Sequence, residues 1–340
     1  MSPGFEANDL GYHTRGDLIN GHAVLGYQTF HPDRIFRHWS ATATYYRNYD
    51  FGGNRTDEDI ALDVAGQFLS YWTAGLHYDY EPPKFSHWLT RGGPMAYYPA
   101  GSTYSGMVGS DNRKPFVFKL SGRLRTHPSG GYNWTLEGGL TWKPRTNISL
   151  SVGPSYTWRY SNGEWITSVV DPLKIETYGT RYILADIVQK TLPVEIRLNW
   201  TFTPRLSLQA YLQPFIGSSD YRRFKELKAA RTFDFDFFGE SDGSTISFVN
   251  GVYTVDPDGP AGWAPSFTFH DPNFRLRSLR GTVVLRWEYR PGSMLYFVWT
   301  QKRADTSLAG EYDLRDDLGA TFRAPGENIF LLKCTYRFQL

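Results

Sequence analysis

Apolar and polar side chains alternate along nearly every segment of this chain of 340 residues. Between residues 71 and 82, for example, the large or apolar positions are Trp72, Ala74, Leu76, Tyr78 and Tyr80, and polar or small residues stand between them. Successive side chains of a β-strand point to opposite sides, so each such strand has one apolar and one polar face. The sequence therefore predicts an all-β protein built from two-faced strands.

Two all-β architectures share this pattern. The apolar face is the core of a soluble sandwich or propeller, but it contacts lipid in a membrane barrel whose polar face lines the lumen. Aromatic residues make up 17% of the chain, and Trp142, Trp200 and Trp287 each stand just before a short turn. Amphipathic rings repeated at one end of the strands are typical of a membrane-interface girdle. We therefore expect a transmembrane, antiparallel, up-and-down β-barrel, with the soluble sandwich or propeller as the alternative.

Fifteen strands of alternating direction are predicted. They cover residues 18–31, 35–50, 58–69, 71–82, 98–110, 113–126, 131–143, 147–161, 164–171, 179–189, 191–203, 205–217, 277–290, 294–303 and 328–340. Bacterial single-chain barrels have an even number of strands, so we expect an odd number of further strands upstream. The first residues also lack the features of a signal peptide, which we expect upstream as well. Residues 1–17 are then an extracellular segment.

We expect residues 1–340 to form a single domain with long extracellular loops. The longest loop, 218–276, begins with a helix-like stretch at 222–228 and contains Asn250-Gly251, a strong signal for a β-hairpin. Loops of this length inside a compact domain are usually functional or mobile. We expect a folded cap or an inward plug here, with a disordered loop as the alternative, and a short helix within residues 304–327.

Several stretches resemble one family of Gram-negative bacteria. They are Phe5–Gly11, Arg91–Pro94, Arg197–Pro204, Gln213–Phe215, Arg280–Ser293 and Trp299–Gln301, of which Arg280–Ser293 is the most specific. The family is domain of unknown function 5916, a C-terminal segment that follows a carbohydrate-binding module similar to family 9. The resemblance implies a cell-surface protein of the outer membrane whose sugar-binding module and earliest strands are absent from this chain. Members are sometimes labelled hydrolases, but no catalytic motif comes with that label.

Charged residues on the polar face are the first candidates for binding a polar solute. The candidates are Arg123, Arg125, Arg159, Arg197, Arg286, Asp63, Asp79 and Glu137. The acidic members lie on early strands and the basic ones mostly on later strands, so opposite walls of a lumen would carry opposite charges, as in pores that orient polar solutes. The alternative is a lattice of internal salt bridges that fills or stiffens the barrel.

A catalytic pair and a metal site are weaker hypotheses. His38 and Ser40 share one face of a predicted strand, but a nucleophilic hydroxyl needs a base and a third group that orients the base. We expect this pair to face the lumen as polar lining. Asp234, Asp236, Asp256 and Asp258 offer oxygen ligands for Ca²⁺ without forming a complete calcium loop, so turn formation is the preferred interpretation. We predict no cofactor.

Composition excludes several other classes of protein. The 36 basic and 34 acidic residues give a net charge of +2, which argues against a nucleic-acid partner. The single cysteine, Cys334, excludes an internal disulfide framework. No apolar run reaches the roughly 18 residues of a membrane helix. We therefore expect a porin-like barrel in the outer membrane, in contact with its lipid, that binds or passes a polar solute such as a glycan fragment. A pure membrane anchor and a membrane-embedded hydrolase are the alternatives.

Overall fold

The computed structural model describes residues 1–5, 16–241, 243–307 and 313–338. Most of the predicted extracellular segment 1–17 lies outside these residues. Within the described part, the protein is all-β and antiparallel, with α1 (Leu314–Arg323) as its α-helix and η1 (Ile175–Thr177) as a single 3-10 turn. No helix in this part of the chain is long and apolar enough to cross a membrane.

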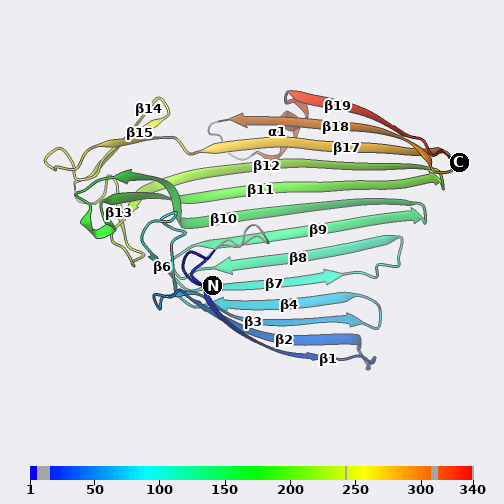
Figure 1. Cartoon of the computed structure of the whole chain (residues 1–340), viewed down its shortest axis with the longest axis horizontal. Helices are drawn as coiled ribbons and strands as arrows, with labels where there is room; N and C mark the ends of the chain where they lie inside the picture. The colour runs from blue at the N-terminus through cyan, green and yellow to red at the C-terminus, as the bar shows by residue number, and fades with distance from the viewer. Residues whose placement is uncertain (6–15, 242, 308–312, 339–340) are drawn as a thin grey trace.

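A large antiparallel sheet forms most of the molecule (Figure 1). Thirteen of its strands lie side by side in the order in which they occur in the chain. They are β1 (Ile19–Gln28), β2 (Phe36–Tyr49), β3 (Arg55–Phe68), β4 (Thr73–Glu81), β7 (Gly101–Gly109), β8 (Phe116–Thr126), β9 (Tyr132–Arg145), β10 (Ile148–Val170), β11 (Thr180–Thr203), β12 (Leu206–Leu227), β17 (Phe274–Arg290), β18 (Ser293–Ser307) and β19 (Gly326–Thr335). This is the up-and-down order that alternating strands predict.

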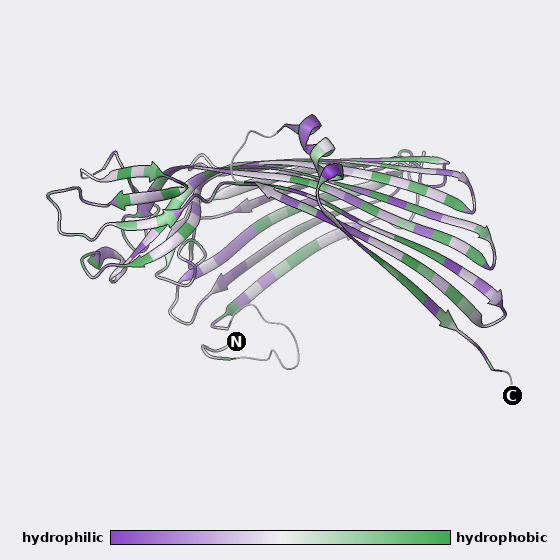
Figure 2. Ribbon diagram, turned by 90° about the horizontal axis from the view of Figure 1, so that it is seen from above, coloured by the Kyte–Doolittle hydropathy of each residue, from purple (hydrophilic) through white to green (hydrophobic). Residues whose placement is uncertain are grey.

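The two edges of the main sheet are open in the part of the chain that the structure describes. There β1 pairs with β2 and β19 with β18, and neither edge strand has a second neighbour. Because thirteen strands alternate in direction, β1 and β19 run the same way. Figure 2 shows how strongly the strands cross one another from one edge to the other, as the right-handed twist of strands demands.

The prediction of fifteen separate strands is wrong in one region. Predicted strands 147–161 and 164–171 together are β10, and predicted strands 179–189 and 191–203 together are β11. The turn expected at Asn162-Gly163 is instead a register shift between Ser161 and Glu164. Such a β-bulge bends a strand without reversing it. The predicted directions of 164–171 and 179–189 are therefore reversed.

The connections differ between the two ends of the sheet. At one end β9 joins β10, β11 joins β12 and β17 joins β18 through two residues each. At the other end lie the long connections, which contain the hairpin of β5 (Lys84–Ser86) and β6 (Ala96–Tyr98), the small sheet of β14 (Thr245–Val249), β15 (Val252–Asp256) and β16 (Phe267–His270), and α1. We call these the turn end and the capped end.

The capped end has an apolar core of its own, because β10, β11 and β12 extend beyond the other strands. Ile183 and Ala185 of β11 pack on one side against Val255 and Phe269 of the small sheet. Tyr182 and Leu184 pack on the other side in a second core with Leu89, Ala96 and Leu227. Both faces of β11 are buried here, so residues 182–187 form a nearly continuous apolar run instead of alternating.

The loop predicted at 218–276 is folded over this core, but its first part differs from the prediction. Residues 222–227 continue β12 as a strand and are not helical. Phe224 packs in the first core and Leu227 in the second, so tertiary packing outweighs the helix propensity of this stretch. Asn250 and Gly251, both with positive φ, form the turn between β14 and β15. β13 (Phe235–Phe237) pairs with the end of β12.

Charged side chains are also buried at the capped end, and each has partners. Arg181 Nη1 lies 2.7 Å from Glu226 Oε1, and Arg181 Nε lies 2.6 Å from Asp171 Oδ2. Lys225 donates to Asp186, and burial lowers the pKa of Lys225 despite that hydrogen bond. Buried charges persist only when paired, so this network fixes how the three long strands and the cap meet.

A buried carboxylate attaches the first half of helix α1 to the main sheet, and Arg303 of β18 donates hydrogen bonds to the carbonyl oxygens of Phe322 and Ala324 at its end. Asp317 is fully buried, and its Oδ1 lies 2.6 Å from both Arg275 Nη2 and Arg277 Nε of β17. Asp313 caps the helix by accepting hydrogen bonds from the backbone N–H groups of Arg315 and Asp316. Figure 2 shows α1 standing on one side of the sheet.

We predict that Asp317→Asn loosens α1 on the sheet. The substitution leaves two arginines without their shared buried carboxylate, and breaking a buried ion pair costs about 3–5 kcal/mol. Hydrogen exchange of residues 314–323, followed by mass spectrometry, should become at least tenfold faster. Asp316→Asn, one residue away and exposed, is the matched control, and equal exchange in the two variants would contradict the assignment.

Candidate functional site

The eight charged residues singled out from the sequence lie on one face of the main sheet, which we call the polar face. Register shows this strand by strand: Asp63 is opposite His77, His77 opposite Ser105, and Ser105 opposite Arg123. Residues directly opposite each other in antiparallel strands point to the same side. The same reasoning places the other six on this face, namely Asp79, Arg125, Glu137, Arg159, Arg197 and Arg286.

Many side chains of the polar face bind one another across strands. His77 Nδ1 lies 2.7 Å from Asp63 Oδ1. Glu137 accepts hydrogen bonds from Ser121 and Ser155 on the two flanking strands, at 3.0 and 3.4 Å. The polar face is therefore an organised hydrogen-bonded surface and not a set of isolated solvated charges.

Charges of opposite sign are only partly separated across the polar face. Two of the three acidic candidates, Asp63 and Asp79, lie on β3 and β4, and the third, Glu137, lies on β9, while the arginines lie on β8, β10, β11 and β17. The two groups meet near the capped end, where Arg125 Nη2 lies 2.6 Å from Glu81 Oε1. Lys84 of β5 approaches from the cap, with its Nζ 2.6 Å from Asp57 Oδ1 and 3.1 Å from Glu81 Oε2.

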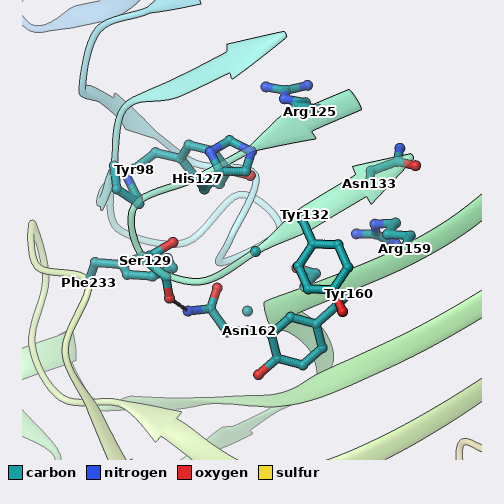
Figure 3. A pocket seen from close by; sticks show the side chains of 14 residues that line it. Tyr98, Arg125, His127, Ser129, Tyr132, Asn133, Arg159, Tyr160, Asn162 and Phe233 are labelled. Carbon is teal, nitrogen blue, oxygen red and sulfur yellow. Dashed lines mark hydrogen bonds between the residues drawn. The ribbon is translucent and has the colours of Figure 1, made fainter. Parts of the chain in front are cut away.

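A small polar pocket lies where the polar face meets the cap (Figure 3). Its volume is about 160 Å³. Arg125, Asn133 and Arg159 come from three adjacent strands, and Tyr98 and Phe233 come from the cap. His127, Ser129 and Asn162 line it near the turn between β8 and β9, together with Tyr132 and Tyr160. We call it the β8–β10 pocket.

Several contacts shape the β8–β10 pocket. The ring centroid of Tyr98 lies 5.6 Å from that of His127 and 6.2 Å from that of Phe233, both edge to face. Asn162 Nδ2 donates to the carbonyl oxygen of Ser129 at 2.6 Å, which ties β10 to the turn between β8 and β9. Aromatic rings and amide groups thus form walls around the guanidinium groups.

The surroundings of the pocket favour a neutral ring for His127 and a charged ammonium group for the nearby Lys84. Burial and the positive charge of Arg125 lower the pKa of His127 below its ordinary value of 6.5. Its Nδ1 lies 3.2 Å from the carbonyl oxygen of Ala100, so a neutral ring that donates there keeps Nε2 as an acceptor. For Lys84, burial is the largest single influence and by itself would lower the pKa. The carboxylates of Asp57 and Glu81 together outweigh burial, so the pKa of Lys84 is raised above its ordinary value.

The weaker candidates from the sequence lie elsewhere. His38 and Ser40 are on the polar face near the turn end, opposite Gln67 and Ala65 of β3. No hydrogen bond or ion pair of the His38 side chain is found among the described residues, so no acid orients it as catalysis would require.

Three of the four aspartates considered as calcium ligands have other partners. Asp236 lies 3.5 Å from Lys174 Nζ and 3.4 Å from Lys228 Nζ. Asp256 and Asp258 accept hydrogen bonds from backbone N–H groups of residues 259, 263 and 264. In the described part of the chain, no group of three or more His, Cys, Asp or Glu side chains is placed to hold a metal ion.

Most residues of the β8–β10 pocket were not singled out from the sequence. Arg125 and Arg159 were, but Asn133, His127 and Asn162 were not, because single polar residues beside turns are common. Tyr98 and Phe233 reach the pocket from distant loops. Only the three-dimensional meeting of the cap with β8–β10 brings them together.

The family model of a domain of unknown function, DUF5916, matches residues 1–339. The chain belongs to this family. No curated protein and no solved structure matches the chain. The match to DUF5916 confirms the resemblance seen in the sequence, and the geometry of the polar face and of its pocket provides the evidence about function.

We predict that His127 titrates below 6.5 in the folded chain. Burial disfavours the charged ring, so stability is fully present above the unfolded value of 6.5 and is lost as pH falls through the lowered folded pKa. An NMR titration of the His127 ring protons in detergent micelles, compared with the chain unfolded in urea, measures the shift. A folded pKa equal to or above the unfolded one would contradict the assigned burial.

Proposed function

We propose that the main sheet is part of the wall of a transmembrane β-barrel in the outer membrane of a Gram-negative bacterium. Its apolar face contacts lipid, its polar face lines an aqueous lumen, and the capped end lies outside the cell. The lumen binds or passes a polar solute. The exposed apolar face of the sheet is the observation that carries this proposal.

Nothing in the described part of the chain covers most of that apolar face. Leu76 and Leu332, near opposite edges of the sheet, are 71% and 70% exposed. Many others on the same face are also exposed, including Leu62, Val64, Phe118, Leu120, Leu136 and Phe330. Soluble monomers rarely expose apolar patches beyond about 600 Å². Lipid provides the apolar surroundings that such a face requires.

Aromatic pairs mark both borders of the apolar face. Near the turn end the rings of Phe116 and Trp142 lie 6.2 Å apart, and other pairs there are Trp200 with Phe202 and Trp287 with Tyr289. Toward the capped end Trp134 and Tyr156 lie 5.3 Å apart, and Tyr78 and Tyr104 lie 5.2 Å apart. Tyr and Trp prefer the two interfaces of a bilayer, so these pairs support two girdles.

The distance between the two borders fits a bilayer. Trp134 and Trp142 both lie on β9, eight residues apart. At about 3.4 Å per residue they are about 27 Å apart along the strand. A strand tilt of about 40° reduces this to roughly 21 Å across the membrane, near the roughly 25 Å apolar band of such barrels.

The two ends of the sheet support its orientation. Outer-membrane barrels have short turns on the periplasmic side and longer loops outside the cell. The two-residue turns are all at the turn end, and the cap is at the other end. The cap's buried core and paired charges resemble those of a water-soluble domain, which suits a position outside the bilayer.

We predict that cysteines at adjacent positions of β8 differ in accessibility. In a Cys334→Ser background, Ser121→Cys faces the lumen and should react with a charged maleimide in lipid vesicles, whereas Leu120→Cys should be protected at least tenfold. Leu120 is 50% exposed in the structure itself, so protection would come from lipid. Equal reactivity of the two cysteines in vesicles would refute the membrane assignment.

We also predict channels in planar bilayers. Arg123 is exposed on the polar face. Arg123→Glu changes the sign of one lumen charge and should shift the reversal potential in a salt gradient toward cation selectivity, because rings of charge set the selectivity of pores. Absence of channels from the reconstituted full-length protein would refute passage and favour a filled barrel that acts as an anchor.

A further inference from the structure

Three polar side chains of the β8–β10 pocket form a row across the sheet. Arg125 of β8 is directly opposite Asn133 of β9, and Asn133 is directly opposite Arg159 of β10. Adjacent strands are about 4.8 Å apart, so the two arginines start about 10 Å from each other. An amide therefore stands between two guanidinium groups on one face, and Figure 3 shows the three side chains beside the pocket.

This row has hydrogen-bonding capacity that the protein does not satisfy. Arg125 uses Nη2 for Glu81, and its Nε has no partner although the atom is buried. Asn133 Oδ1 is likewise buried without a partner. Leaving a buried polar atom without a hydrogen bond costs about 1–3 kcal/mol. A bound ligand that supplies the missing hydrogen bond recovers this free energy, so such atoms indicate a binding site.

The charge of the pocket lining favours an anion. Two guanidinium groups line it, and none of its lining residues is acidic. Their carboxylate partners, Glu81 for Arg125 and Glu164 for Arg159, lie at 2.6 Å and are not among the lining residues. Each guanidinium has five N–H donors, so one carboxylate partner leaves donors for a second.

The size and the remaining walls favour a ring that carries hydroxyl groups. The volume of about 160 Å³ is close to that of a cavity that holds one benzene ring, so the pocket takes a six-membered ring whose substituents extend to its walls and into its open mouth. Tyr98 and Phe233 supply apolar ring surface, while Asn162 and the neutral His127 add polar groups from both sides. An aliphatic acid would leave these polar groups unused.

We infer that the β8–β10 pocket binds a six-membered sugar ring that carries a carboxylate, a hexuronate, with the carboxylate between Arg125 and Arg159. The hydroxyl groups face Asn133, Asn162 and His127 Nε2, and the aromatic rings cover the apolar face of the sugar. This assignment names the solute class for the proposed lumen. It rests on the proposed function only for the route by which the sugar arrives.

The test is a calorimetric titration of the whole chain in detergent micelles with glucuronate, glucose and acetate. We expect glucuronate to bind at least about tenfold more tightly than either of the others, because only glucuronate satisfies both the guanidinium groups and the hydroxyl partners. Equal affinity for glucose would remove the role of the arginines. Equal affinity for acetate would reduce the pocket to a general anion site, and no binding of glucuronate would overturn the proposal.

Two substitutions sharpen this test. Arg159→Gln should weaken glucuronate binding at least about tenfold and leave the weak binding of glucose unchanged. Asn133→Asp has the same shape but places a carboxylate between the two arginines, so glucuronate binding should be lost while the thermal midpoint of unfolding stays equal or rises. Arg280→Gln on β17 removes a charge of the same kind from the polar face, outside the pocket. It is the matched control and should bind like the unmodified chain.

Glucuronate binding in micelles tests the pocket, and conductance in bilayers tests the proposed lumen, so either proposal can be refuted without the other. Loss of conductance with intact glucuronate binding would refute passage through the lumen and keep the pocket. Channels without glucuronate binding would refute the hexuronate assignment alone.

Discussion

The sorting of side chains between the two faces of the main sheet governs the rest of the molecule. Along each strand the alternation leaves one apolar face, most of which the described part of the chain does not cover, and one polar face bound together by hydrogen bonds across strands. A sheet with an uncovered apolar face needs an apolar environment, and its polar groups need partners or water. The proposed membrane location, the lumen and the binding pocket all follow from this division.

The cap departs from that division because its strands are buried on both faces. Where β10, β11 and β12 extend past their neighbours, apolar cores lie on both sides, and charges such as Arg181 and Glu226 are enclosed with their partners. The long strands are shared by wall and cap, so the two parts are continuous. The pocket lies at their junction, where Tyr98 and Phe233 of the loops meet arginines of the wall.

The sequence predicted the strands correctly where the alternation of apolar and polar residues alone determines the structure. Residues 71–82 and 131–143 alternate cleanly, and their strands and faces were predicted correctly. The predictions were wrong in the cap, where packing on both faces of a strand also determines which residues are apolar and which structure they adopt. β11 was predicted as two strands separated at Lys190, although the strand continues through that residue, and packing between two cores made a strand of the helix-like residues 222–227. The shared face of Arg125 and Arg159 was predictable from alternation, but their lateral alignment with Asn133 depends on register, which local sequence does not specify.

The equal direction of β1 and β19 restricts how the hydrogen-bond ladders at the two edges are completed. Direct pairing of these edges would give a parallel seam in an otherwise antiparallel sheet, with slanted hydrogen bonds that are slightly weaker per residue. A single strand running the opposite way is antiparallel to both edges at once. Two added strands bring back the parallel seam, and three remove it. The parity of the strands, more than the chemistry of either edge, therefore decides which additions to this sheet preserve one uniform pattern of hydrogen bonds.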